Sequence, residues 1–253
     1  MTVNPVSHKA VLLLRPGNMP DAFTRQLRET GRECFVHSFI EIEPLPVDKK
    51  QLTDLKQRHW DGIVVVSKNA AHYAAKTGFT DVPSKYYAVG PGTASFAAKH
   101  LNTPVSCPTF IHQSEGLLDL ADLQKLEQQS WLIIRGEGGR ELLADALRAR
   151  GASVDYWEVY RRKQLTLNDP ELIEQWIKSV GTIVVTSAEQ LGYFLSSMPS
   201  SAKTWLDNCQ WIVPSHRLKG LIPFGQSDSI KVTGSAADAI LMNALIADGK
   251  THD

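Results

Sequence analysis

Short runs of consecutive apolar residues recur along the chain, separated by longer segments in which apolar residues stand three or four apart. Runs such as residues 63–66 (Ile-Val-Val-Val), bounded by polar residues, are typical of strands buried on both faces of a sheet. The intervening stripes, such as Leu117, Leu118 and Ala121, have helical spacing. This alternation predicts an α/β protein whose parallel sheets carry helices on both faces.

The two halves of the chain resemble each other at a constant spacing of 120 residues. Residues 11–17 (VLLLRPG) correspond to 131–137 (WLIIRGE), and residues 61–75 share 5 of 15 identities with the window 120 positions later, where ordinary composition gives about one. The similarity continues with slippage, since 87–91 resembles 211–215 at a spacing of 124. We interpret this as an internal duplication in preference to two convergent βα units.

Length and charge narrow the function classes. The 253 residues suit two domains of about 125 residues each. Lys and Arg total 27, as do Asp and Glu, so the formal net charge is zero. A general binder of nucleic acid or anionic membranes would show a basic excess, so any acidic ligand must be held by local positive potential.

The sequence lacks the common cofactor and metal motifs. The three cysteines are far apart and form no CxxC pair, and the eight histidines are scattered, which argues against zinc, iron–sulfur and disulfide frameworks. Residues 136–141 fail the GxGxxG pattern because Glu141 takes the last glycine position. Neither GxxxxGK[ST] nor GxSxG occurs. We expect no cofactor and no metal. We also expect a cytoplasmic protein, since no apolar run reaches signal-peptide or membrane-span length.

The predicted strand ends offer a different chemistry. Six of them lead into helices and are rich in Gly, Ser, Thr and Arg: 15–17, 67–69, 90–93, 135–140, 186–188 and 214–217. Ligands of open α/β sheets bind beyond such ends, and the free N–H groups and dipole of a helix N-terminus favour an anion. For any single loop a turn and helix cap is the simpler interpretation. For the set we favour binding of a carboxylate or phosphate, with Arg135 and Arg140 as the better candidates because one loop carries both.

The order of these segments resembles the uroporphyrinogen-III synthase family. The resemblance is carried by VLLLRP at 11–16, SKNA at 67–70, YAVGPGTA at 87–94, the 135–140 loop, EVY at 158–160 and VTSA at 185–188, and it runs from about residue 10 to 247. One departure stands at 213–216 (Val-Pro-Ser-His), where the family often has Gly-Pro-Thr-Thr. There Ser215 takes the place of the first threonine and His216 that of the second.

The resemblance implies an interleaved two-domain fold. Two Rossmann-like (flavodoxin-like) parallel-sheet domains would consist of residues 1–38 with 164–253 and of residues 39–163, with a substrate cleft between them. A two-stranded linker would join them, formed by the extended-looking segments 39–43 and 156–162. The repeat alone would favour a simple cut near residue 126.

The resemblance also implies an activity. The family converts hydroxymethylbilane, a linear tetrapyrrole with eight carboxylates, to uroporphyrinogen III by losing water, closing the ring and inverting ring D. The family needs no cofactor, and the resemblance implies a monomer in transient contact with the preceding pathway enzyme, hydroxymethylbilane synthase. Catalysis would consist largely of holding one reactive geometry.

Site residues follow from the strand ends and the resemblance together. The expected substrate-binding residues are Arg15, Ser67, Lys68, Asn69, Gly90, Thr93, Arg135, Gly136, Gly139, Arg140, Ser187, Ala188 and Ser215. Tyr160 is the family's candidate for assisting departure of hydroxide, although for an arbitrary tyrosine a packing role is the simpler interpretation. Strand alternation predicts that Tyr156, Glu158 and Tyr160 share one face. The alternative function is a non-catalytic, bilobed anion- or tetrapyrrole-binding sensor module.

Overall fold

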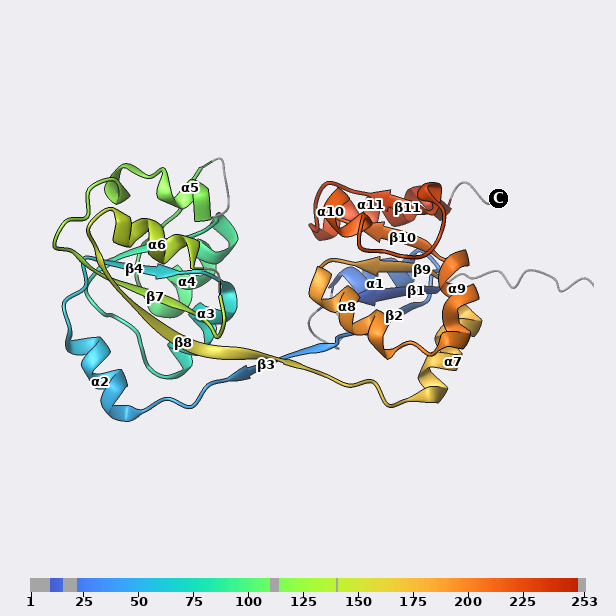
Figure 1. Ribbon diagram of the computed structural model, residues 1–253, viewed down its shortest axis with the longest axis horizontal. Coiled ribbons are helices and arrows are strands. Elements are labelled where there is room, and N and C mark those ends of the chain that lie inside the picture. Colours follow the sequence, from blue (N-terminus) through green and yellow to red (C-terminus); the bar gives the residue numbers. More distant parts are fainter. Residues whose placement is uncertain (1–9, 16–21, 110–113, 140, 250–253) are drawn as a thin grey trace, which may run out of the picture. The chain divides into compact units, whose positions relative to one another are not determined.

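A computed structural model describes residues 10–15, 22–109, 114–139 and 141–249 (Figure 1). These residues form an α/β protein with two sheets, one of five strands and one of six. The chain divides into two compact units, residues 1–41 with 164–253 and residues 42–163. No helix in the described ranges has the length and apolar character needed to span a bilayer.

The first unit contains the five-stranded sheet, in which all four neighbouring strand pairs are parallel. In sheet order its strands are β11 (Ile230–Val232), β10 (Gln210–Val213), β9 (Val180–Val185), β1 (Ala10–Leu14) and β2 (Cys34–His37). Its helices are α1 (Ala22–Glu29), α7 (Pro170–Ser179), α8 (Ala188–Ser197), α9 (Lys203–Asn208), α10 (His216–Lys219) and α11 (Asp238–Gly249). Each face of the sheet has its own core, because Leu12 and Leu14 of β1 pack with α7, α8 and α9 while Val11 and Leu13 pack with α1 and α11.

The second unit contains the six-stranded sheet. In sheet order its strands are β3 (Ile40–Pro44), β8 (Ser153–Gln164), β7 (Ser130–Gly136), β4 (Gly62–Val65), β5 (Lys85–Ala88) and β6 (Val105–Ser106). Its helices are α2 (Lys49–Gln57), α3 (Lys68–Lys76), α4 (Pro91–Leu101), α5 (Ser114–Leu118) and α6 (Leu142–Ala149). Ile63 and Val65 of β4 pack with α3 and α4, whereas Val64 packs with α5 and α6. Short 3-10 helices lie at Ala121–Leu123 in this unit, and at Ser200–Ala202 and Ser227–Ser229 in the first.

The two units repeat the same strand register. Leu12 pairs with Ile183 in the first sheet, and the residues 120 positions away, Leu132 and Ile63, pair in the second. The next pair repeats as well, since Leu12 faces Phe35 and Leu132 faces Asp155. This repetition supports the predicted duplication. The predicted spacing of 124 for the following strand is wrong by one residue, because Tyr86 and Trp211 both pair with the central strand at equivalent positions.

The chain passes between the units twice. The passages fall between residues 41 and 42, inside β3, and between 163 and 164, at the end of β8. The family resemblance implies a first boundary after Ser38. The Leu45 N–H donates to the Val159 carbonyl and the Leu165 N–H to the Phe39 carbonyl, so the two neighbouring strands run antiparallel. Residues 12–14 pair with residues 183–185, whereas residues 63–65 belong to the other sheet.

Candidate functional site

Each sheet has one topological switch point, where the connections from two neighbouring strands leave in opposite directions. It lies between β1 and β9 in the first unit and between β7 and β4 in the second. Leu14 pairs with Val185 and Ile134 with Val65 at the carboxyl ends of these strands. Ligands of open α/β sheets bind beyond these ends. In each unit, therefore, an arginine at a strand end (Arg15 or Arg135) lies beside the serine that follows the neighbouring strand (Ser187 or Ser67).

The serines of the predicted strand ends cap the helices that follow. The hydroxyls of Ser67, Ser187 and Ser215 accept hydrogen bonds from the N–H groups of the third helical residue, at 3.1, 3.1 and 3.3 Å. Gly90 caps α4 without a side-chain bond. A serine cap satisfies one of the four N–H groups that a helix start leaves without intrahelical partners. The capping interpretation is therefore correct at these ends, and it leaves the anion-binding character of the first turns intact.

The other candidates lie in the same first turns. Lys68 and Ala188 are the first residues of α3 and α8, and Asn69 follows Lys68. Lys68 and Asn69 are exposed. Thr93 lies one turn into α4, where its N–H donates to the Gly90 carbonyl. Arg140 lies outside the described residues.

Tyr160 lies at the carboxyl end of the second sheet, close to Ser67. Its ring is 2% exposed and stacks on Tyr73, with ring centroids 6.0 Å apart. Its hydroxyl is 3.2 Å from Ser67 Oγ, so the phenol meets the cap of α3. Gly136 leaves room for the Tyr160 ring, because a Cβ on residue 136 would lie 2.5 Å from Tyr160 Cε2 and Cζ.

The predicted face of Tyr160 is wrong, and the cause is a β-bulge. Arg135 pairs with Glu158, but the next residue, Gly136, pairs with Tyr160, so β8 has one extra residue at this point. Val159 and Tyr160 are therefore both buried in the same core as Trp157, whereas Tyr156 packs in the core on the opposite face. A bulge re-aims a side chain in this way, and simple alternation does not predict it.

Arg135 is enclosed by two carboxylates and an aromatic ring. Its guanidinium donates to Glu158 Oε1 from Nη2 at 3.0 Å and to Glu141 Oε1 from Nη1 at 2.9 Å, and it lies 3.7 Å from the centroid of the Tyr156 ring. Burial alone would lower the pKa of Arg135, but the hydrogen bonds that it donates to Glu141 and Glu158 outweigh burial and raise that pKa. The side chain is 9% exposed. For Arg135 to contact a substrate carboxylate directly, one of the two glutamates would have to leave.

Arg15 holds a similar place in the first unit. Its Nη1 donates to Asp238 Oδ1 at 2.8 Å, and its guanidinium carbon lies 5.1 Å from the centroid of the Phe23 ring. The side chain is 15% exposed. Both candidate arginines thus combine an acidic partner with an aromatic face.

Sequence reasoning missed three groups beside these ends. Tyr73 stacks on Tyr160 and donates to the Ile42 carbonyl at 3.0 Å. Glu158 and Glu141 bind Arg135. Gln190 is fully buried. Of these groups, only Gln190 could have been identified from the sequence, because it is a polar residue next to the buried positions Leu191 and Phe194 of one helix.

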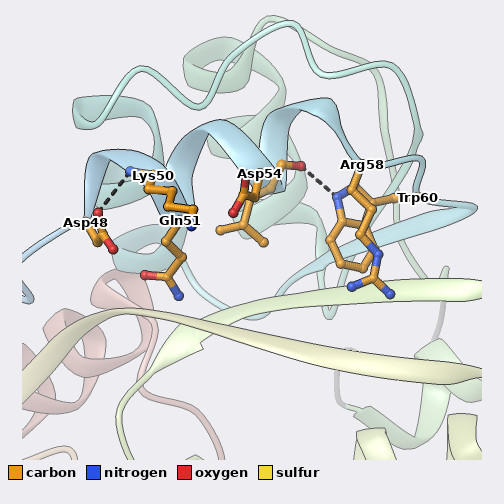
Figure 2. A pocket seen from close by; sticks show the side chains of 7 residues that line it. Asp48, Lys50, Gln51, Asp54, Arg58 and Trp60 are labelled. Carbon is orange, nitrogen blue, oxygen red and sulfur yellow. Dashed lines mark hydrogen bonds between the residues drawn. The ribbon is translucent and has the colours of Figure 1, made fainter.

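A surface hollow on α2 lies away from these ends (Figure 2). It is lined by Asp48, Lys50, Gln51, Asp54, Leu55, Arg58 and Trp60. Asp48 caps α2, and Arg58 stacks over Trp60 and pairs with Asp155. Trp60 precedes β4, so the hollow borders the amino end of the sheet, opposite the strand ends described above. Among the described residues, no cluster of three or more His, Cys, Asp or Glu side chains could hold a metal ion.

Comparison with known proteins points to one family. The family model "Uroporphyrinogen-III synthase HemD" matches residues 21–220. The chain is 32% identical to the uroporphyrinogen-III synthase of Salmonella typhimurium over 246 residues, which cover 93% of this chain and 99% of that one. The Escherichia coli enzyme of the same name is 31% identical over 247 residues, with the same coverage.

Solved structures share the fold at lower identity. A mutant uroporphyrinogen III synthase from Thermus thermophilus superposes with a TM-score of 0.61 at 18% identity, covering 95% of this chain and 99% of that one. Uroporphyrinogen-III synthetase from Helicobacter pylori superposes with a TM-score of 0.60 at 17% identity, covering 94% and 99%.

Proposed function

The chain belongs to the uroporphyrinogen-III synthase family, and from that premise we propose that it cyclises hydroxymethylbilane to uroporphyrinogen III. The reaction removes one water, closes the macrocycle and inverts ring D, as a step of tetrapyrrole and haem biosynthesis. The observation that carries this proposal is the relationship to the Salmonella enzyme, which extends over 99% of that enzyme's length.

The strand ends suit a substrate with many carboxylates. Helices α3, α4, α8 and α10 all begin at the carboxyl ends of their sheets with Ser or Gly caps. Their first turns offer backbone N–H groups and positive dipole ends without requiring net positive charge. We propose that these turns bind the carboxylates of the substrate. Its contacts would be made by Ser67, Lys68, Asn69, Gly90, Thr93, Gly136, Gly139, Arg140, Ser187, Ala188 and Ser215.

The two enclosed arginines have a different role in this proposal. Arg15 and Arg135 keep a positive charge beside each switch point while their acidic partners hold the guanidinium groups in place. Because neither is free to swing toward a ligand and acidic partners offset each charge, they would act by stabilising their loops and holding the neighbouring backbone N–H groups in place. Most of the binding free energy would then come from backbone N–H groups spread over several loops.

We propose that Tyr160 assists the first chemical step. Hydroxide is a poor leaving group, and a phenol can donate a hydrogen bond as negative charge builds on the departing oxygen. The hydroxymethyl oxygen leaves with the C–O electron pair and takes up a proton to become water. The pyrrole nitrogen gives up its N–H proton, and its electrons form the azafulvene. The substituted carbon of ring D then attacks the azafulvene methylene carbon to give a spiro intermediate, which fragments and recloses. The Ser67 hydroxyl, 3.2 Å from the phenol oxygen, would orient the phenol.

Two further points belong to the proposal. We place the protein in the cytoplasm, which agrees with free thiols at Cys34, Cys107 and Cys209.

We also propose brief contact with hydroxymethylbilane synthase. Released bilane closes by itself to the wrong isomer, so a short transit between the enzymes would preserve it.

The test is direct. Purified protein is mixed with hydroxymethylbilane, the products are oxidised, and isomers I and III of uroporphyrin are separated. We expect isomer III to form in proportion to protein concentration, whereas the sample without protein gives isomer I. Binding of the bilane with isomer I formed at the protein-free rate would overturn the proposal and favour the sensor module.

A further inference from the structure

Gln190 is a fully buried polar side chain that the proposed chemistry does not use. It lies in the first turn of α8, where its backbone N–H donates to the capping hydroxyl of Ser187 at 3.1 Å. Its side-chain oxygen accepts from the Phe39 N–H at 2.8 Å, and its amide nitrogen donates to Ser38 Oγ at 3.0 Å. A buried amide is stabilising only when it is hydrogen-bonded, and here both ends of it are.

Phe39 joins three segments that are far apart in sequence. Its N–H is held by Gln190 of α8, and its carbonyl accepts from the Leu165 N–H at 2.9 Å. Its ring is fully buried and meets Phe194 of α8 edge-on, with centroids 5.9 Å apart. Phe39 directly precedes β3, and Leu165 directly follows β8. Gln190 thus holds Phe39 directly and Leu165 through Phe39, and these two residues lie at the first-unit ends of the two passages.

The second unit has a tie at the equivalent place. Ser67 and Ser187 are 120 residues apart, and each caps the helix after the central strand of its sheet. In the second unit the crossing strand β8 reaches that cap through the Tyr160 hydroxyl. In the first unit the crossing segment reaches the first turn of α8 through Gln190. Different side chains therefore make the same kind of connection in the two halves.

We propose that Gln190 is a positioning residue for the reaction. It fixes the passage segments to the same helical turn that receives a substrate carboxylate, an inference that rests on the proposed function of that turn. Without the hydrogen bond to Gln190, the Phe39 N–H has lost its buried acceptor. The backbone around Phe39 and Leu165 then unfolds locally more often. The fraction of molecules with the passages in their native place falls, and the apparent affinity for the bilane falls by that fraction.

The experiment compares three variants of the full chain. Gln190→Met removes both side-chain hydrogen bonds at similar volume. Ser38→Ala removes one of them, together with the bonds of Ser38 Oγ to the Ile40 N–H and carbonyl, and keeps the bond to Phe39. Trp205→Phe is the matched control, because it deletes a buried side-chain bond to the Val180 carbonyl (2.9 Å) within the same unit and leaves the hydrogen bonds of Phe39 in place. Amide hydrogen exchange at Phe39, measured without substrate, is compared with global stability from urea unfolding, and KM and kcat are measured for isomer III.

In Gln190→Met we expect exchange at Phe39 to accelerate by about tenfold or more beyond the change in global stability. KM should rise by about three- to tenfold, and kcat should change by less than about twofold. Ser38→Ala should show the same pattern more weakly, and Trp205→Phe should lose global stability without the local effect.

Two results would overturn the proposal. One is unchanged protection of Phe39 in a folded Gln190→Met protein. The other is an equal rise of KM in Gln190→Met and Trp205→Phe at equal loss of stability, which would show that Gln190 contributes only to folding. Failure of the proposed function is a separate outcome, because wild type itself would then form no isomer III while the exchange result would still stand.

Discussion

Replacing Gly136 with alanine tests whether the place of Tyr160 matters for turnover. The new Cβ would lie 2.5 Å from two atoms of the Tyr160 ring, whereas carbon atoms in contact prefer 3.5–4.0 Å. The ring must therefore move by about 1 Å. The Tyr160–Ser67 hydrogen bond already measures 3.2 Å, so such a shift removes it. Overpacking of this kind costs about 1–3 kcal/mol of stability.

The kinetic consequence follows from the role proposed for the phenol. If Tyr160 donates a hydrogen bond to the departing hydroxide, Gly136→Ala should lower kcat by about 10²-fold, the scale of a lost proton donor. The double variant Gly136→Ala/Tyr160→Phe should be little slower than either single variant, because both changes remove the same interaction. Initial rates of isomer III formation give kcat, and urea unfolding gives stability.

Gly62→Ala is the matched control. Its Cβ would lie 2.5 Å from Cη2 of Trp131, an equally close approach to an aromatic ring in the same sheet. Gly62 begins β4, at the end of the sheet opposite Tyr160. This variant should lose comparable stability and keep its kcat. A folded Gly136→Ala protein with the wild-type kcat, or an equal loss of kcat in Gly62→Ala, would refute the reasoning.

Three other outcomes are expected. Tyr160→Phe should fold normally, lose about 10²-fold or more in kcat and still give mainly isomer III; rates within a factor of two of wild type would make Tyr160 a packing residue. Arg15→Ala should weaken substrate binding by about 1–2 kcal/mol, seen as a higher KM, and complete inactivity of the folded variant would contradict distributed binding. Burial lowers the pKa of His37 although Asp169 opposes it, so folding favours the neutral imidazole. The free energy of unfolding should therefore fall as pH drops below about 6.5, and His37→Phe should flatten that dependence in urea titrations at pH 5–7.5.

Much of the fold could be predicted because it rests on local pattern. Fully apolar runs mark the central strands. The spacing of 120 residues relates Leu12 to Leu132 and Ile63 to Ile183, and the structure repeats it, because Leu12 pairs with Ile183 as Leu132 pairs with Ile63. The slip by one residue at the next strand arose because β5 and β10 have four residues each and share no identical residue in the observed register, so no single alignment stood out.

The candidate site was less predictable because its geometry depends on contacts between distant segments. The bulge that turns Tyr160 toward Ser67 depends on Gly136 of the neighbouring strand, 24 residues earlier in the chain. The enclosure of Arg135 by Glu141 and Glu158 likewise requires β7, β8 and the start of α6 to be in place. The residue types at the strand ends were enough to locate the candidate site. They could not show that the guanidinium of Arg135 is already paired with carboxylates of the same unit.

The strand order also has a consequence for synthesis on the ribosome. Residues 42–163 form one continuous unit, so that sheet can complete as soon as β8 has emerged. By contrast, β1 ends at Leu14 and its neighbour β9 begins at Val180. The nascent β1 and β2, with their apolar faces, must wait for the intervening unit before their sheet can form. We therefore expect the later-starting unit to fold first, and ribosome-bound chains stopped before β9 to expose β1 to chaperones and proteases.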